Sequence, residues 1–247
     1  MTDDTTDETA EPSGDRDDPD GAGDAPADDR HAGTPGKGRT PTARAIEPAA
    51  PDEFGRVQVW WGDGKGKTTA ALGMAFRAAG HGYRVHVLQF MKGGAASVDD
   101  VRGEYNAIDA LPGITYENSG HYGWHALRDG SDDDEHAARA AGGLRRAREL
   151  VDAARDAEGP HPLDGPPEDG VHMLVLDEIL YAVSQGLLDE SDVLELVESK
   201  PDDLELVLTG SHERPAYLSE RADLVTEVRK EKHPMDVGQR ARKGTEY

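Results

Sequence analysis

Short apolar runs alternate with longer helical segments along most of the chain after residue 55. The runs are rich in β-branched, leucine or aromatic residues, which predicts strands at 56–61, 83–91, 113–117, 171–178, 204–210 and 222–233. The segments between them predict helices at 68–80, 132–157 and 191–200, the last beginning at a Ser191 cap. Strands alternating with helices favour right-handed crossovers. The sequence therefore predicts an α/β fold with a mostly parallel sheet covered on both faces.

The segment joining the first strand to the first helix has the composition of a phosphate-binding loop. It reads Gly62, Asp63, Gly64, Lys65, Gly66, Lys67, Thr68 and Thr69. Its glycines permit backbone N–H groups to point inward, Lys67 supplies positive charge, and Thr68 supplies a hydroxyl for Mg²⁺. The following helix adds the positive end of its dipole. The general motif G-x-x-x-x-G-K-[ST] would have a glycine at position 61, where this chain has Trp61.

Polar residues also close other predicted strands, at the edge of a parallel sheet where ligands bind. They are Gln89, Asp177, Glu178, Thr209, Gly210 and Ser211. Apolar residues followed by Asp177 form the pattern that holds Mg²⁺, directly or through water, in phosphate-binding enzymes. Two simpler interpretations compete: the acids cap a following helix, and the glycine-rich segment is a turn with solvated lysines. The combination of strand, loop, helix and acidic strand end favours a nucleotide and metal site.

The first 50 residues differ in composition from the rest. They hold 13 acidic and 5 basic residues, and their only large aliphatic residue after Met1 is Ile46. Such a segment cannot bury enough apolar surface to offset the entropy of ordering. We therefore expect a disordered acidic tail over 1–50 and a folded domain over 51–247.

The overall charge and the absence of cysteine limit the classes of function. With 50 acidic and 27 basic residues the net charge is −23, which argues against nucleic acid as a partner. The chain has no cysteine, no run long enough to span a membrane and no secretory signal, so we expect a cytoplasmic protein without disulfides or thiolate metal sites. Strong acidity with 8 lysines against 19 arginines favours an origin in a halophilic archaeon; the alternative is an ordinary acidic protein.

Four blocks of sequence together resemble the P-loop family of ATP:corrinoid adenosyltransferases, which serve cobalamin synthesis and salvage. They are "GDGKGKTTAALGMAFRAAGHGYRVHVLQFMKG", "LVLDEILYAV", "LVLTG" and "ADLVTEVRKEKHPMDVGQRARKGTEY". The family also lacks the leading glycine of the loop, so Trp61 is no defect. The resemblance implies a three-layer, RecA-like P-loop NTPase fold. The chain departs from the family's closing pattern at Arg242 and Thr245.

The resemblance also implies a reaction and a set of site residues. In the family, Co(I) of a corrinoid attacks the 5′-carbon of ATP and triphosphate leaves, with Mg²⁺ present. Gly62 to Thr69 would bind ATP, and Lys67 and Glu178 would be catalytic. Thr68, Asp177 and Glu178 would hold the metal, and Tyr122 and Trp124 would press on the corrin. A homodimer and an external Co(II) reductase, such as a flavoprotein, are also implied.

Two other functions fit the same loop. A RecA-like ATPase would use Glu178 to polarise a water molecule, and a regulatory module would bind nucleotide with only incidental turnover. The identity of the products formed from ATP distinguishes the three.

Overall fold

The computed structural model describes residues 42–91, 103–120, 133–157, 159–240 and 242–245. The chain separates into two units, Met1–Ala43 and Arg44–Tyr247. All the elements below lie in the second unit. Within the described part of the chain, no helix combines the length and the apolar character needed to cross a membrane.

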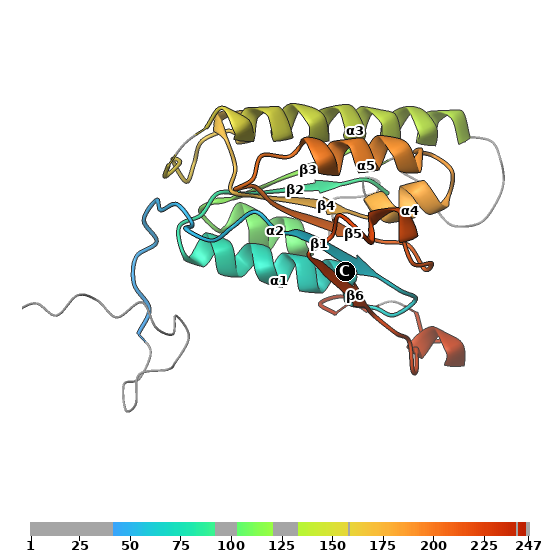
Figure 1. The fold of residues 1–247 in the computed structure, drawn as a ribbon. Coiled ribbons are helices and arrows are strands. Elements are labelled where there is room, and N and C mark those ends of the chain that lie inside the picture. Colours follow the sequence, from blue (N-terminus) through green and yellow to red (C-terminus); the bar gives the residue numbers. More distant parts are fainter. Residues whose placement is uncertain (1–41, 92–102, 121–132, 158, 241, 246–247) are drawn as a thin grey trace, which may run out of the picture. The chain divides into compact units, whose positions relative to one another are not determined.

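Six strands form one sheet in the second unit (Figure 1). They are β1 (Val57–Trp61), β2 (Val85–Gln89), β3 (Ile114–Asn118), β4 (Met173–Asp177), β5 (Glu205–Thr209) and β6 (Leu224–Glu227). Their order across the sheet is β3-β2-β4-β5-β1-β6, and every neighbouring pair is parallel. The sheet is thus wholly parallel, where the sequence predicted a mostly parallel one. All strands present their carboxyl ends at the same edge.

Helices cover both faces of the sheet, giving three layers (Figure 1). The helices are α1 (Lys67–Gly80), α2 (Gly103–Asp109), α3 (Asp133–Arg155), α4 (Ile179–Ser184) and α5 (Glu190–Ser199), with 3-10 turns η2 (Pro167–Asp169), η3 (Ala216–Leu218) and η4 (Pro234–Val237). Helices α1 and α2 lie on one face, and α3 and α5 lie on the other. The predicted three-layer α/β fold is confirmed.

Each face of the sheet has its own apolar core. On the α1 face the helix contributes Ala71, Ala75, Ala78 and Ala79, all buried against strand residues. Small side chains at this spacing bring the helix close to the sheet. On the other face, larger residues of α3 and α5 pack against the same strands. Strands β2, β4 and β5 are buried along their whole length, as expected for the centre of a parallel sheet.

The order of the strands determines which strand ends meet. Strand β5 lies between β1, which leads into the glycine-rich loop, and β4, which ends at Asp177. One strand is thus inserted between the loop strand and the acidic strand. This order places the ends of β1, β5 and β4 next to one another at the edge where the loop begins.

Several local features differ from the sequence-based expectation. Helix α4 was not among the predicted helices, and the last strand, predicted over 222–233, covers only Leu224–Glu227. The short helix α2 was not predicted; it has seven residues and begins with a glycine, so its periodicity is weak. The predicted Ser191 cap is wrong: α5 already includes Glu190, and Asp189 occupies the cap position in extended conformation. Asp189 and Glu190 put negative charge at the helix start, where the dipole favours it.

Candidate active site

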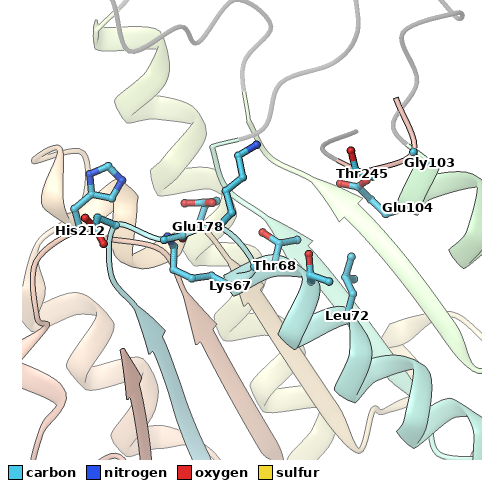
Figure 2. Close-up of a pocket in the computed structure, with 14 residues that line it drawn as sticks. Lys67, Thr68, Leu72, Gly103, Glu104, Glu178, His212 and Thr245 are labelled. Atoms are coloured by element: carbon cyan, nitrogen blue, oxygen red, sulfur yellow. The ribbon is translucent and has the colours of Figure 1, made fainter. Parts of the chain in front are cut away.

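A cavity of about 480 Å³ opens at the carboxyl edge of the sheet (Figure 2). Residues from the loop after β1, the start of α1, the start of α2 and the ends of β4 and β5 surround it. The lining residues are Asp63, Gly64, Lys65, Gly66, Lys67, Thr68, Thr69, Leu72, Gly103, Glu104, Glu178, His212, Gly244 and Thr245. The cavity thus combines cationic, hydroxyl and carboxylate side chains in one place.

Trp61 belongs to the strand and not to the loop. It pairs with Glu227 of β6, its carbonyl accepts a hydrogen bond from Val228 N at 2.7 Å, and its ring packs against the core. The chain turns one residue later, at Gly62, whose φ of 119° lies in the region that glycine adopts readily. The missing motif glycine is therefore replaced by a strand residue, and Gly62 opens the loop.

The segment after β6 holds the loop in place from outside. Gly64 N donates to Val228 O at 2.8 Å, and Lys230 N donates to the Asp63 carboxylate at 2.9 Å. The hydrogen bond from Lys230 N is the main reason why the pKa of Asp63 is lowered. A Cβ at Gly62 would lie 2.3 Å from Val228 O, so the close contact requires glycine. The loop's shape therefore depends on β6 as well as on its own glycines.

Lys67 folds back over the loop. Its Nζ donates to the carbonyl oxygens of Gly62 and Gly64, at 2.7 and 3.0 Å. Partial burial lowers the pKa of Lys67, while Glu178 and the carboxylates of Asp63 and Asp177 oppose that effect. The ammonium group is thus held at the floor of the loop, where a bound phosphate would compete with the two carbonyl groups for it.

Thr68 is fixed by a buried carboxylate. Its Oγ1 donates to Asp177 Oδ1 at 2.8 Å, and Thr209 Oγ1 donates to the same oxygen at 2.7 Å. Gln89 Nε2 donates to the other oxygen, Asp177 Oδ2, at 3.0 Å. Asp177 is fully buried and does not line the cavity. Residues from α1, β2, β4 and β5 therefore meet at this carboxylate, as their positions at strand ends predicted.

Glu178 presents its side chain to the cavity on the side facing Lys67 (Figure 2). Its backbone is left-handed, with φ of 64° and ψ of 14°, which is strained for a residue with a side chain. Its N–H donates to Thr209 Oγ1 at 3.0 Å. A Cβ at Gly210 would lie 2.7 Å from Tyr181 N, so glycine there lets the ends of β4 and β5 approach.

Comparison with known proteins identifies the family. The family model for ATP:corrinoid adenosyltransferases BtuR/CobO/CobP matches residues 53–247. The chain belongs to this family. The adenosyltransferase resemblance found in the sequence is confirmed.

Curated relatives of the family match over most of their length. A corrinoid adenosyltransferase of Pseudomonas aeruginosa is 32% identical over 80% of this chain and 86% of its own. Its counterpart in Escherichia coli K12 is 33% identical over 80% and 88%, and one from a Sinorhizobium species is 33% identical over 91% and 96%. Among solved structures, a KaiC-like protein from Pyrococcus horikoshii has 16% identity and a TM-score of 0.41, covering 78% of this chain and 85% of its own.

The donor set of this adenosyltransferase suits a magnesium ion bound together with a nucleotide. The described residues contain no group of three or more histidines, aspartates or glutamates able to hold a metal by themselves. The cavity lining holds the hydroxyls of Thr68, Thr69 and Thr245 and the carboxylates of Asp63, Glu104 and Glu178, and Thr68 and Glu178 are the two predicted from the sequence as metal ligands. Mg²⁺ prefers a few oxygen ligands from protein together with water and phosphate, so these residues fit it only when phosphate supplies the remainder.

The structure brings together most of the site residues predicted from the sequence. Seven of the eight loop residues line the cavity, whereas Gly62 shapes the loop from behind. Tyr122 and Trp124, predicted to contact the corrin, lie outside the described residues.

Several residues that line the cavity were not predicted from the sequence. They are Leu72, Gly103, Glu104, His212 and Gly244. His212 directly follows Thr209, Gly210 and Ser211, which were predicted at the ligand-binding edge of the sheet. Its position next to them could therefore have indicated that it lines the cavity. The residues of α2 gave none, because the helix itself was not predicted. Thr245, noted in the sequence as a departure from the family pattern, also lines the cavity.

Proposed function

We propose that this protein transfers the 5′-deoxyadenosyl group of ATP to the Co(I) ion of a corrinoid and releases triphosphate. The observation that carries the proposal is the cavity formed by Lys67, Thr68 and Glu178 in a chain of the corrinoid adenosyltransferase family. The curated relatives carry the name corrinoid adenosyltransferase, and each covers more than four fifths of its own length in the match.

The reaction is a displacement at carbon. The Co(I) electron pair forms the cobalt–carbon bond to C5′, and the bond between C5′ and its oxygen breaks. The oxygen keeps that bond's electron pair and leaves as triphosphate. The nucleophile carries no proton, so no general base is needed. The protein's task is therefore to hold ATP and to stabilise negative charge on the leaving group.

The loop residues have distinct tasks in this proposal. Lys67 would exchange the carbonyl groups of Gly62 and Gly64 for phosphate oxygens, and the N–H groups at the start of α1 would face the same anion. Mg²⁺, held by Thr68 and Glu178 together with phosphate, would neutralise part of the triphosphate's charge. Asp177 would act through Thr68, because its carboxylate oxygens accept hydrogen bonds from Thr68, Thr209 and Gln89.

The corrinoid side of the proposal depends on the resemblance. Tyr122 and Trp124 match the aromatic pair that, in the family, presses on the lower face of the corrin. Both complete cobalamin and its precursor cobyrinic acid a,c-diamide are candidate substrates. An external reductase for Co(II) and a homodimeric state are part of the same proposal.

Product analysis tests the proposal directly. The protein is incubated with MgATP and chemically reduced cobalamin, and in parallel with reduced cobyrinic acid a,c-diamide, with ATP omitted as the control. We expect triphosphate and a light-sensitive cobalt–carbon adduct in equal amounts from at least one corrinoid. Formation of ADP and phosphate, without an adduct, would instead identify an ATPase in which Glu178 orients water.

A further inference from the structure

A chain of hydrogen bonds connects helix α2 to the threonine of the phosphate-binding loop. Tyr105 Oη of α2 donates to Gln89 Oε1 at 2.6 Å. Gln89 Nε2, at the end of β2, donates to Asp177 Oδ2 at 3.0 Å. Asp177 Oδ1 accepts the hydroxyl of Thr68 at 2.8 Å. Three hydrogen bonds, through the side chains of Gln89 and Asp177, thus link Tyr105 to Thr68.

The chemistry of the groups fixes which one donates and which one accepts at each step of this hydrogen-bond chain. The Asp177 carboxylate accepts hydrogen bonds, so Gln89 must turn its NH₂ toward it. The amide oxygen of Gln89 then faces Tyr105, which must donate its hydroxyl proton. Asn118 Nδ2 donates to the same phenol oxygen at 2.9 Å, which occupies one of its acceptor positions. Each member is therefore held in a single orientation by its neighbours.

Burial makes the connection stiff. Gln89 is 1% exposed and Asp177 is fully buried, so an unsatisfied amide or carboxylate there would carry a large desolvation penalty. The backbone is fixed as well, because Phe90 N donates to Asp177 O at 2.9 Å and Ser119 N donates to Gln89 O at 2.9 Å. The ring of Tyr105 is held separately from its hydroxyl, by parallel stacking on Tyr116 with centroids 4.6 Å apart.

One end of this hydrogen-bond chain, Thr68, lines the cavity, and the other end, Tyr105, directly follows two residues that line it. Gly103 and Glu104, which precede Tyr105 on α2, form one wall, and Thr68 belongs to another (Figure 2). We propose that Tyr105 is a positioning residue that sets the orientation of the Thr68 hydroxyl through Gln89 and Asp177. It thereby couples the seating of α2 to the binding of ATP with magnesium. The proposal rests on the proposed function in taking MgATP as the ligand.

The structure offers a matched pair of variants for the test. Tyr105→Phe removes one hydroxyl and keeps the stacked ring, and Tyr116→Phe removes the hydroxyl of the other ring in the same stack. ATP affinity is measured by calorimetry over a series of Mg²⁺ concentrations, without corrinoid. We expect Tyr105→Phe to raise the Mg²⁺ concentration for half-maximal enhancement of binding by about three- to tenfold. Tyr116→Phe should change it less than about twofold.

Measurements in Thr68→Ala protein distinguish a positioning role of Tyr105 from a general effect on stability. In Thr68→Ala protein, Tyr105→Phe should shift the Mg²⁺ response no further, because the hydroxyl that it positions is gone. Equal shifts from both tyrosine variants would overturn the proposal. So would a lower melting temperature for Tyr105→Phe with an unchanged Mg²⁺ response. A wild-type protein that binds MgATP but forms no adenosylcorrinoid would contradict the proposed function alone, since this measurement does not depend on turnover.

Discussion

The position and the partial burial of the Lys67 ammonium group favour the binding of an anion. The ammonium group contacts two carbonyl oxygens of its own loop and lies near Glu178. Partial burial lowers its pKa, so the group is less well solvated than a surface lysine and gains more from a phosphate partner.

Lys67→Ala should lower kcat/KM for ATP by at least about a hundredfold, since it removes a preorganised charge that faces the leaving group. Initial rates of adenosylcobalamin formation measure the effect. The melting temperature should change little, because the loop's contacts with Val228 and Lys230 do not involve this side chain.

Lys65 is the matched control for that experiment. It lines the same cavity but is exposed. Lys65→Ala should lower kcat/KM for ATP by less than about tenfold, as expected for the loss of a solvated charge. Turnover like that of the wild type in Lys67→Ala protein would exclude it from the phosphate site.

At the scale of elements, the hydrophobic pattern predicted all six strands and the glycine-rich loop. Periodicity shows that a strand is buried but not which strand lies beside it. The placement of β5 between β1 and β4 could therefore not be read from the pattern alone. Thr209 was predicted at the right edge of the sheet, but its hydrogen bond to Asp177 depends on that neighbour relation. The departure at Glu178 into left-handed conformation left no trace in the sequence.

His86 of β2 is a buried titratable group within the sheet. Its Nδ1 lies 2.8 Å from Thr115 Oγ1, and its Nε2 has no hydrogen-bond partner among the described residues. Burial lowers the pKa of His86 to about 4, and the nearby carboxylate of Glu117 only partly opposes this. Glu117 is itself paired with Arg146 of α3, at 2.8 Å from Nε. The ring is therefore neutral in the folded protein at neutral pH.

This histidine should make the fold sensitive to acid. Below pH 6.5 the unfolded chain binds a proton at His86 that the folded chain does not bind until about pH 4. Its contribution to the free energy of unfolding is therefore present above pH 6.5 and is lost as the pH falls toward 4, by about 3 kcal/mol in total. Urea denaturation at several pH values across this window measures the loss.

His86→Gln is the control, because an amide does not titrate and can still bond to Thr115. Its free energy of unfolding should fall less steeply than that of the wild type between pH 6.5 and 4. Parallel curves for the two proteins would show that His86 is not responsible, since the carboxylates titrate in both.

At the scale of the whole molecule, repulsion between negative charges is the main electrostatic feature. The net charge is −23; residues 1–40 carry 12 acidic and 4 basic residues, so the rest of the chain retains −15. Exposed ion pairs, such as Arg221 with Glu198 at 2.7 Å, contribute only about 0.2 to 1 kcal/mol each. Screening by salt weakens these pairs but also weakens the repulsion. The large excess of one sign makes the second effect the stronger.

Removal of residues 1–40 should therefore leave a protein that melts within about 2 °C of the full chain, because that segment has almost no apolar side chains to bury. The cut preserves Ala49, whose N–H donates to Gly82 O at 3.0 Å. Both proteins should melt at higher temperature as KCl is raised from about 0.1 M to 2 M, since the Debye length falls from about 10 Å to below 3 Å. Calorimetry of the two chains in both salts measures this. A salt response lost with residues 1–40 would place the repulsion in that segment, and a melting temperature that falls with salt in both would show that ion pairs dominate.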